Sequence, residues 1–356
     1  FYDYPGQAYS VIFPEAQETT GLMHTPRTQA AAKSLYSVSL GTNREFRTEM
    51  LQLHYTSYMV PGRTYSYHVL SKDFKLLKEN GAPGYNPSLY RAEQILSKER
   101  QVPISLVYRA DLHPQGLHGG PFPTLLTGYG AYGACQDPYF DAGLLSLLDR
   151  GVVYAVAHVR GGGELGREWY EEGRYFKVKN RFYDFIAAAE SLVSFGIAEK
   201  SRLAAWGESS GGLLVSASVN LRPDLFKAIV LEVPFTDAMN TMADPTIPLT
   251  CGEWEEIGNP NERETFQYMM EYSPYDNIRM QDYPAALVTA SLNDTMVGYW
   301  EPLKYVSKLR RMKTDSNPVL LKVNFHAGHG GSTDRYEAMR DQAHNFAFLL
   351  DQLGVV

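Results

Sequence analysis

The residues Gly207–Gly212, which read Gly-Glu-Ser-Ser-Gly-Gly, constrain the fold most, because they lie between a strand-like run and a helix-like run. The strand-like run is Arg202–Trp206, and the helix-like run begins at Leu213. A Gly-x-Ser-x-Gly turn this tight holds its serine in strained backbone geometry, which only small flanking residues tolerate. The pattern therefore predicts a nucleophile elbow, with the hydroxyl of Ser209 exposed at its tip.

A serine hydroxyl becomes a good nucleophile only when a base takes its proton, so the elbow predicts an acid and a histidine further along the chain. Asp294 and His329 follow Ser209 in that order, and each comes directly after an apolar, strand-like run. Loops at one edge of a parallel sheet often carry the chemistry of an enzyme. We therefore expect a Ser209, Asp294, His329 triad, and we prefer His329 to its neighbour His326 because glycines flank it.

Strand-like and helix-like segments alternate from Val102 onward, which is the order of a mostly parallel sheet covered on both faces by helices. The expected strands are Ile104–Tyr108, Thr124–Thr127, Val152–Val159, Leu203–Trp206, Ala228–Val233, Ala286–Ala290 and Val319–Phe325. The expected helices are Arg181–Phe195, Leu213–Leu221, Trp300–Arg311 and Asp334–Leu353. Together with the elbow, this order predicts an α/β fold of the α/β-hydrolase type over residues 102–356.

The first part of the chain has a different pattern. Short alternating runs separated by Gly, Pro and Asn are typical of antiparallel strands. These runs are Ser34–Leu40, Arg47–His54 and Thr64–Val69. Residues 76–101 are rich in Lys, Asn, Gly and Pro, so we expect a linker there, between an antiparallel β segment over residues 1–75 and the catalytic domain.

One glycine-rich stretch imitates a dinucleotide site. Gly161–Gly166 matches Gly-x-Gly-x-x-Gly, and Asp184 follows at a suitable distance. A true fingerprint needs its acid at the end of a strand, whereas Asp184 falls inside an expected helix. We therefore expect no nucleotide cofactor.

Composition excludes several other classes of function. The net charge of −7 repels nucleic acid, and no apolar run approaches the length that crosses a bilayer. The two cysteines cannot build a disulfide framework, and no Cys/His spacing fits a zinc site. We expect no metal, no nucleic-acid or membrane partner, and a reducing, cytoplasmic compartment.

Several further motifs occur in a specific order between residues 102 and 356. They are Gly128–Gly133, Arg160–Gly166, Arg222–Phe226, Gly252–Glu256, Ser273–Asn277, Tyr299–Pro302 and Gly328–Gly331. With these motifs and the elbow, the chain resembles the prolyl oligopeptidase family of serine peptidases, and within it the oligopeptidase B group. The resemblance implies that residues 1–75 are the closing part of a β-propeller, which is incomplete here.

The resemblance also implies the donors that stabilise the transition state. In this family, a tyrosine hydroxyl and the backbone N–H after the nucleophile bind the oxyanion of the acyl-transfer intermediate. The matching residues are Tyr129 and Ser210. Tyr129 lies between two glycines directly after an expected strand, and this position supports the role.

Substrate preference follows from the same resemblance. Glu253 and Glu255 match two acids that are associated with cleavage after basic residues, and an ionised carboxylate pairs well with a guanidinium. Bacterial relatives also place two acids after the glycine-tyrosine loop, for a second basic residue. Here these positions hold Asp137 and Tyr139, so the pair of acids is incomplete.

The residues and the resemblance predict a serine oligopeptidase that cleaves short basic peptides after Arg or Lys through an acyl-enzyme. Two alternatives stay open. The chain could be a general esterase or aminoacyl peptidase, because fold and triad do not determine the acyl group. It could also be an inactive module, because its propeller segment is truncated.

Overall fold

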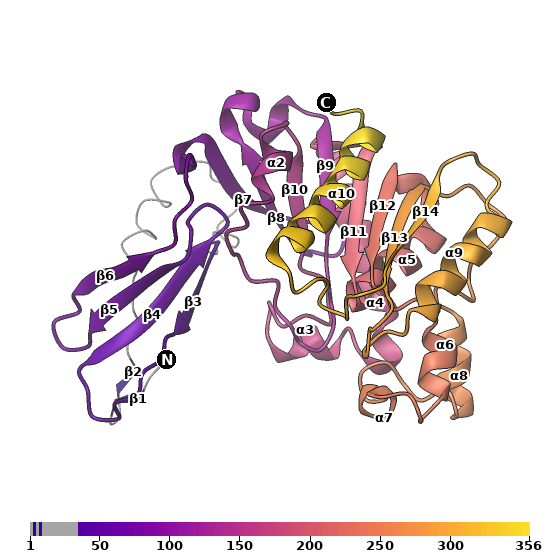
Figure 1. Cartoon of the computed structure of the whole chain (residues 1–356), viewed down its shortest axis with the longest axis horizontal. Helices are drawn as coiled ribbons and strands as arrows, with labels where there is room; N and C mark the ends of the chain where they lie inside the picture. The colour runs from indigo at the N-terminus through magenta and orange to yellow at the C-terminus, as the bar shows by residue number, and fades with distance from the viewer. Residues whose placement is uncertain (1–2, 5–6, 9–34) are drawn as a thin grey trace. The chain divides into compact units, whose positions relative to one another are not determined.

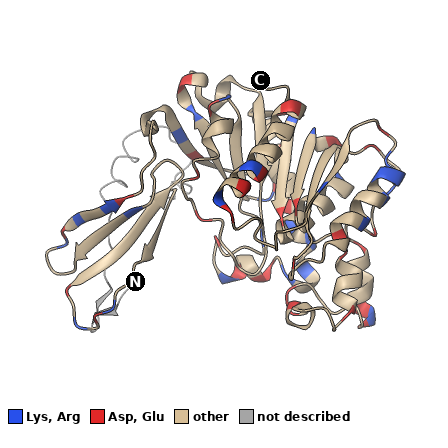
Figure 2. Cartoon of the chain, viewed as in Figure 1, with Lys and Arg blue, Asp and Glu red and all other residues tan. Residues whose placement is uncertain are grey.

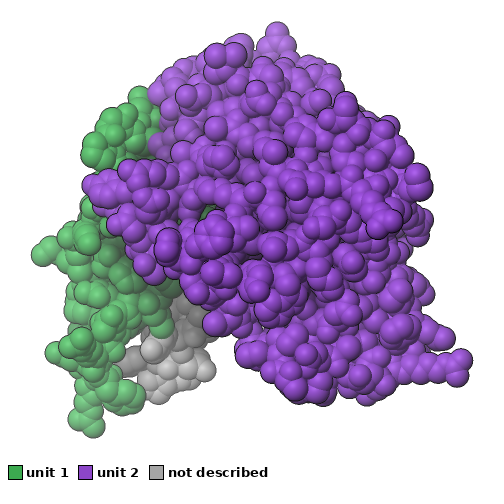
Figure 3. All heavy atoms as spheres, turned by 45° about the vertical axis from the view of Figure 1, so that its right-hand side comes forward, with its two compact units in different colours: residues 1–88, 92–94, 137–141 green, residues 89–91, 95–136, 142–356 purple. Residues whose placement is uncertain are grey.

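The computed structural model describes residues 3–4, 7–8 and 35–356 (Figure 1). The chain forms two compact units, shown in different colours in Figure 3. Unit 1 comprises residues 1–88, 92–94 and 137–141, and unit 2 comprises residues 89–91, 95–136 and 142–356. Much of the expected propeller segment, namely residues 1–2, 5–6 and 9–34, lies outside the described residues.

Unit 1 contains an antiparallel sheet in the order β3-β4-β5-β6. Its strands are β3 Tyr36–Leu40, β4 Met50–Ser57, β5 Arg63–His68 and β6 Phe74–Glu79, and a separate pair joins β1 Asp3–Tyr4 to β2 Gln7–Ala8. Side chains of a strand point alternately to the two faces, and alternate residues are buried in the second half of β4 and in β5. Leu53 and Tyr55 of β4 pack with Tyr65 and Tyr67 of β5. The expected antiparallel strands are confirmed.

The structure corrects the linker that we expected over residues 76–101. β6 continues to Glu79, and a further strand, β7, spans Tyr90–Leu96. The Gly and Pro residues that suggested a linker all lie between these strands, at positions 81–87. Turn residues therefore obscured the strand that follows them.

Unit 2 is built on the eight-stranded sheet β14-β13-β12-β11-β9-β10-β8-β7. The strands from β9 to β14 run parallel to their neighbours, whereas β8 is antiparallel to β10. The strands after β7 are β8 Pro103–Arg109, β9 Phe122–Thr127, β10 Val153–Ala157, β11 Ala198–Glu208, β12 Ala228–Glu232, β13 Ala285–Ser291 and β14 Val319–Asn324. The α/β-hydrolase fold expected for this part of the chain is confirmed.

Helices cover both faces of this sheet, with α10 Arg335–Leu353 in front and α4 Lys179–Ser194 and α5 Ser210–Leu221 behind it in Figure 1. Strands covered on both sides become continuously apolar, and residues 228–231 of β12 are all buried. The other α-helices among the described residues are α2 Leu145–Leu148, α3 Arg167–Glu171, α6 Ala238–Ala243, α7 Thr250–Glu253, α8 Arg263–Met270 and α9 Trp300–Met312.

Charged residues of both signs are interspersed over the described elements in Figure 2. Within residues 3–4, 7–8 and 35–356, no helix is both long and apolar enough to cross a bilayer. The same described residues contain no group of at least three His, Cys, Asp or Glu side chains placed to hold a metal ion.

Candidate active site

Ser209 lies at a sharp turn between β11 and α5. Its backbone angles are φ 54° and ψ −118°, a conformation that costs free energy for any residue with a side chain. A Cβ atom on Gly207 would lie 2.0 Å from the backbone oxygen of Gly211, so only glycine fits where strand and helix approach. Two hydrogen bonds fix the turn, from Ser209 N to Glu232 O at 2.9 Å and from Phe235 N to Ser209 O at 3.0 Å.

Asp294 lies in the loop after β13, with its side chain 1% exposed. Its Oδ1 accepts hydrogen bonds from the backbone N–H groups of Met296 and Val297, each at 2.8 Å. Its Oδ2 lies 2.8 Å from Nδ1 of His329. An ionised carboxylate only accepts hydrogen bonds, so this contact places the imidazole proton on Nδ1.

His329 completes the contact with the nucleophile. Its Nε2 lies 2.9 Å from Oγ of Ser209, and with Nδ1 protonated this nitrogen accepts the hydroxyl proton. The rival base His326 is exposed, and its backbone N–H donates to Asn324. The structure thus brings the three side chains predicted from the sequence into the geometry of a nucleophile, a base and an orienting acid.

Hydrogen bonds between the acid and base loops continue beyond the ends of β13 and β14. Leu292 N donates to Asn324 O at 2.9 Å, and Asn293 N donates to Ala327 O at 3.2 Å. The side-chain amide of Asn293 also donates to Phe325 O at 3.2 Å. The loops that carry Asp294 and His329 are therefore joined where they leave β13 and β14.

Tyr129 is the predicted side-chain donor of the oxyanion hole. It follows β9, is partly buried, and hydrogen-bonds with Ser209. Burial raises the pKa of Tyr129, and the hydrogen bond with Ser209 opposes this rise. The phenol therefore keeps its proton at neutral pH and can donate it in a hydrogen bond. Ser210 begins α5, where backbone N–H groups have no acceptor within the helix.

The two predicted recognition acids lie in different environments. Glu253 ends α7 and is partly buried, and it hydrogen-bonds with the side chain of Tyr132. Burial raises the pKa of Glu253, and this hydrogen bond opposes the rise. Glu255 is exposed. Asp137 is also exposed and belongs to unit 1, so its role in binding a second basic residue stays a prediction.

Comparison with known proteins agrees with this geometry, because the model of the prolyl oligopeptidase family matches residues 138–356. The chain belongs to this family. The similar relatives include dipeptidyl aminopeptidase BI of Pseudoxanthomonas mexicana, which is 45% identical over 91% of this chain and 45% of its own length. Protease 2 of Moraxella lacunata is 42% identical over 90% of this chain and 46% of its own length.

Two solved structures of oligopeptidase B are also similar. The enzyme from Trypanosoma brucei with covalently bound antipain has a TM-score of 0.87 and 45% identity, covering 91% of this chain and 46% of its own. The enzyme from Leishmania major has a TM-score of 0.86 and 42% identity, covering 90% of this chain and 45% of its own. The chain thus spans about half the length of the family members it matches.

Sequence reasoning assigned no role to Glu256, which lies three residues after Glu253 in the turn that follows α7. It is 5% exposed, and its Oε1 accepts from the backbone N–H of Tyr132 at 3.0 Å and pairs with Arg181. Its Oε2 accepts from the hydroxyl of Tyr170 at 2.8 Å. Glu256 therefore connects the segment that carries Glu253 and Glu255 to the loop that carries Tyr129 and Tyr132.

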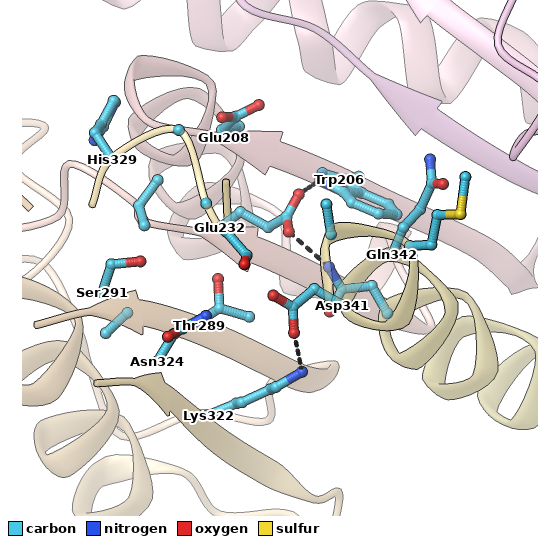
Figure 4. Close-up of a pocket in the computed structure, with 18 of the residues that line it drawn as sticks. Trp206, Glu208, Glu232, Thr289, Ser291, Lys322, Asn324, His329, Asp341 and Gln342 are labelled. Atoms are coloured by element: carbon cyan, nitrogen blue, oxygen red, sulfur yellow. Dashed lines mark hydrogen bonds and ion pairs between the residues drawn. The ribbon is translucent and has the colours of Figure 1, made fainter. Parts of the chain in front are cut away.

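A cavity of about 480 Å³ adjoins the His329 loop (Figure 4). In its wall, the indole N–H of Trp206 donates to Glu232 at 2.8 Å, and the side-chain amide of Asn345 donates to Glu232 at 2.6 Å. Burial, followed by the charge of Glu208, raises the pKa of Glu232 to about 7. The bond from Asn345 attaches α10 to the end of β12, and the bond from Trp206 attaches β11 to the same residue.

The glycine stretch that imitates a dinucleotide site has a structural role. Asp184 lies within α4, as expected from the sequence, and the structure shows that it is fully buried. It pairs with Arg160 and with Arg100 and accepts a hydrogen bond from the backbone N–H of Arg160 at 3.0 Å. Asp184 therefore holds the turn at Arg160, after β10, and does not have the ribose-binding role of the acid in a dinucleotide site.

Proposed function

We propose that this chain acts as a serine oligopeptidase that cleaves short peptides after Arg or Lys. One observation carries the preference for a basic residue. Oε2 of Glu253 is buried and has no hydrogen-bond partner among the described residues. A buried carboxylate oxygen without a partner is costly, and a guanidinium or ammonium group would satisfy it with a charge-assisted hydrogen bond.

The triad supports acylation by a balanced sequence of steps. Oγ of Ser209 attacks the carbonyl carbon of the peptide bond while Nε2 of His329 takes the hydroxyl proton. The carbonyl oxygen becomes an oxyanion that accepts hydrogen bonds from the Tyr129 hydroxyl and the Ser210 N–H. Asp294 stabilises the imidazolium through Nδ1. His329 then gives its proton to the leaving amine as the C–N bond breaks.

The second half-reaction uses the same groups. A water molecule attacks the acyl carbon of the ester on Ser209, and Nε2 of His329 takes one of its protons. The oxyanion forms again in the same place. When the ester bond breaks, His329 returns the proton to Oγ, which releases the peptide carboxylate and restores the enzyme.

Glu253→Gln tests the basic preference. We expect kcat/KM for an N-acylated arginyl amide to fall by about 30-fold or more, because the guanidinium loses its charged partner. Activity on a small neutral ester should persist. Glu255→Gln is the matched control and should have the smaller effect, since Glu255 is exposed. Equal losses on both substrates with Glu253→Gln would contradict the proposal.

The raised pKa of Glu253 predicts a pH dependence of selectivity. The carboxylate binds a cation only when ionised, so the preference is complete above its pKa and is lost as the pH falls through it. Because burial raises this pKa, the loss should begin closer to neutral pH than for a free glutamate. The ratio of kcat/KM for arginyl amide and neutral ester measures it, since the titration of the shared triad cancels. A ratio that stays constant down to the ordinary range of a glutamate would argue against Glu253.

A dipeptidyl aminopeptidase activity is a second candidate, because a relative of that name is 45% identical. An exopeptidase of this kind needs a free amino terminus, whereas an endopeptidase accepts a blocked one. Hydrolysis of an arginyl dipeptide amide with and without an N-acetyl group separates the two. Cleavage of the free form alone would replace the endopeptidase assignment.

A further inference from the structure

The buried groups beside the recognition acid do not balance in charge. Glu253 and Glu256 are carboxylates three residues apart, and the guanidinium of Arg181, on α4, pairs with Glu256. Arg181 is 1% exposed and Glu256 is 5% exposed, so water screens their charges poorly. The guanidinium can neutralise one of the two acids. The identity of that acid determines what Glu253 can bind.

Contacts in the structure assign Arg181 to Glu256. Nη2 of Arg181 pairs with Oε1 of Glu256, and its Nε donates to the backbone oxygen of Gly173. Nη1 of Arg181 and Oε2 of Glu253 are both buried, and neither has a partner among the described residues. Burial raises the pKa of Glu253, and the positive charge of Arg181 opposes part of that rise, so the guanidinium acts on Glu253 as well as on Glu256. Arg181 is therefore placed to neutralise Glu253 if Glu256 releases it.

We propose that Glu256 is a positioning residue that retains Arg181, so that the negative charge of Glu253 is left for the basic side chain of a substrate. Arg181 is then an internal competitor of the substrate guanidinium. This inference rests on the proposed function, because it takes Glu253 to be the acid that binds the basic residue. It adds the reason why Oε2 of Glu253 has no partner among the described residues.

The opposite effects of two single variants provide the test. Glu256→Gln keeps an amide oxygen for the Tyr132 N–H but releases Arg181 to Glu253. We expect the arginyl-to-ester ratio of kcat/KM to fall on the order of 30-fold, as in Glu253→Gln. Arg181→Met removes the competitor, so it should preserve or raise the ratio. A residue pair that only stabilises the fold would leave this ratio unchanged in both variants.

The double variant Arg181→Met/Glu256→Gln should restore the wild-type ratio. Residues 181 and 256 are then both neutral, so the charge of Glu253 has no internal competitor for the substrate. Replacing both members of a buried ion pair by neutral groups of similar size is often tolerated. A double variant with the low ratio of Glu256→Gln would overturn the inference. If Glu256→Gln does not fold, Arg181→Met alone still tests the inference. A lowered arginyl-to-ester ratio in Arg181→Met would overturn it as well.

Asp184→Asn is the matched control, because Asp184 is another buried acid on the same helix and pairs with Arg100 and Arg160. We expect both activities to change in proportion and the ratio to stay constant. Rates are expressed per serine labelled by a fluorophosphonate, which corrects for misfolded protein. Failure of the proposed function is distinguishable, since the wild type itself would then show no arginyl preference.

Discussion

Replacing Ser209 with alanine is expected to lower kcat for an arginyl peptide amide by about 10⁶-fold, because members of a triad act as a unit. Alanine keeps the Cβ atom and loses only the oxygen that attacks the substrate. Binding of an arginyl peptide, measured by calorimetry, should persist, because Glu253 is a separate group. Substantial hydrolysis by a pure Ser209→Ala preparation would end the assignment of the nucleophile.

Labelling with a fluorophosphonate provides the control for that experiment. The wild-type chain should react at Ser209 alone, since only an activated serine attacks this reagent, and the alanine variant should not react. Labelled protein digested and analysed by mass spectrometry identifies the site. An unlabelled wild type would favour the inactive-module alternative, even though the triad contacts are present.

Asp294→Asn is expected to lower kcat by about 10⁴-fold without unfolding the loop. Asparagine retains an oxygen that can accept the N–H groups of Met296 and Val297, which fixes its orientation. Its NH₂ group then faces Nδ1 of His329. Two donors cannot pair, so the imidazole carries its proton on Nε2 and no longer accepts the proton of Ser209.

Asp315→Asn is a matched control for Asp294→Asn. Asp315 also accepts backbone N–H groups within a loop, from Asn317 at 2.7 Å and from Tyr283 at 2.7 Å, but it has no contact with the triad. We expect it to change thermal stability and leave kcat per labelled serine near the wild-type value. Equal losses of kcat in the two variants would indicate that loop stability, not the imidazole tautomer, explains the effect.

The sequence predicted the catalytic fold well where strands are continuously apolar, as in β12 and β13. It was less accurate where charge interrupts a strand. β11 begins at Ala198, earlier than the expected Leu203. The prediction missed this first part of the strand because residues 199–202 are polar, and the pairing of β11 with β9 shifts register between Ala198 and Leu203. β7 was missed because the turn residues before it resemble a linker.

The candidate site divides in the same way. Each triad residue follows its own strand, so local pattern was sufficient to find it. The role of Glu256 depends on Tyr132, which is 124 residues away along the chain, and on Arg181 in a third segment. No local pattern contains such a contact. The run from Glu253 to Glu256 likewise gives no sign of which acids are buried, because all of its glutamates have the same intrinsic polarity.

The hydrogen bonds that join the acid and base loops have a mechanical consequence. Asn293 links the two loops beyond the ends of β13 and β14, so Asp294 and His329 lie on segments that are hydrogen-bonded to each other. Ser209 lies on a different segment, the elbow, which is hydrogen-bonded to the end of β12. Thermal agitation that loosens this end of the sheet should therefore lengthen the gap between Nε2 and Oγ while the imidazole and its carboxylate travel together. In that inactive arrangement His329 would still be oriented by Asp294. Activity would return when the two loops move together toward Ser209, without the His329–Asp294 contact having to form again.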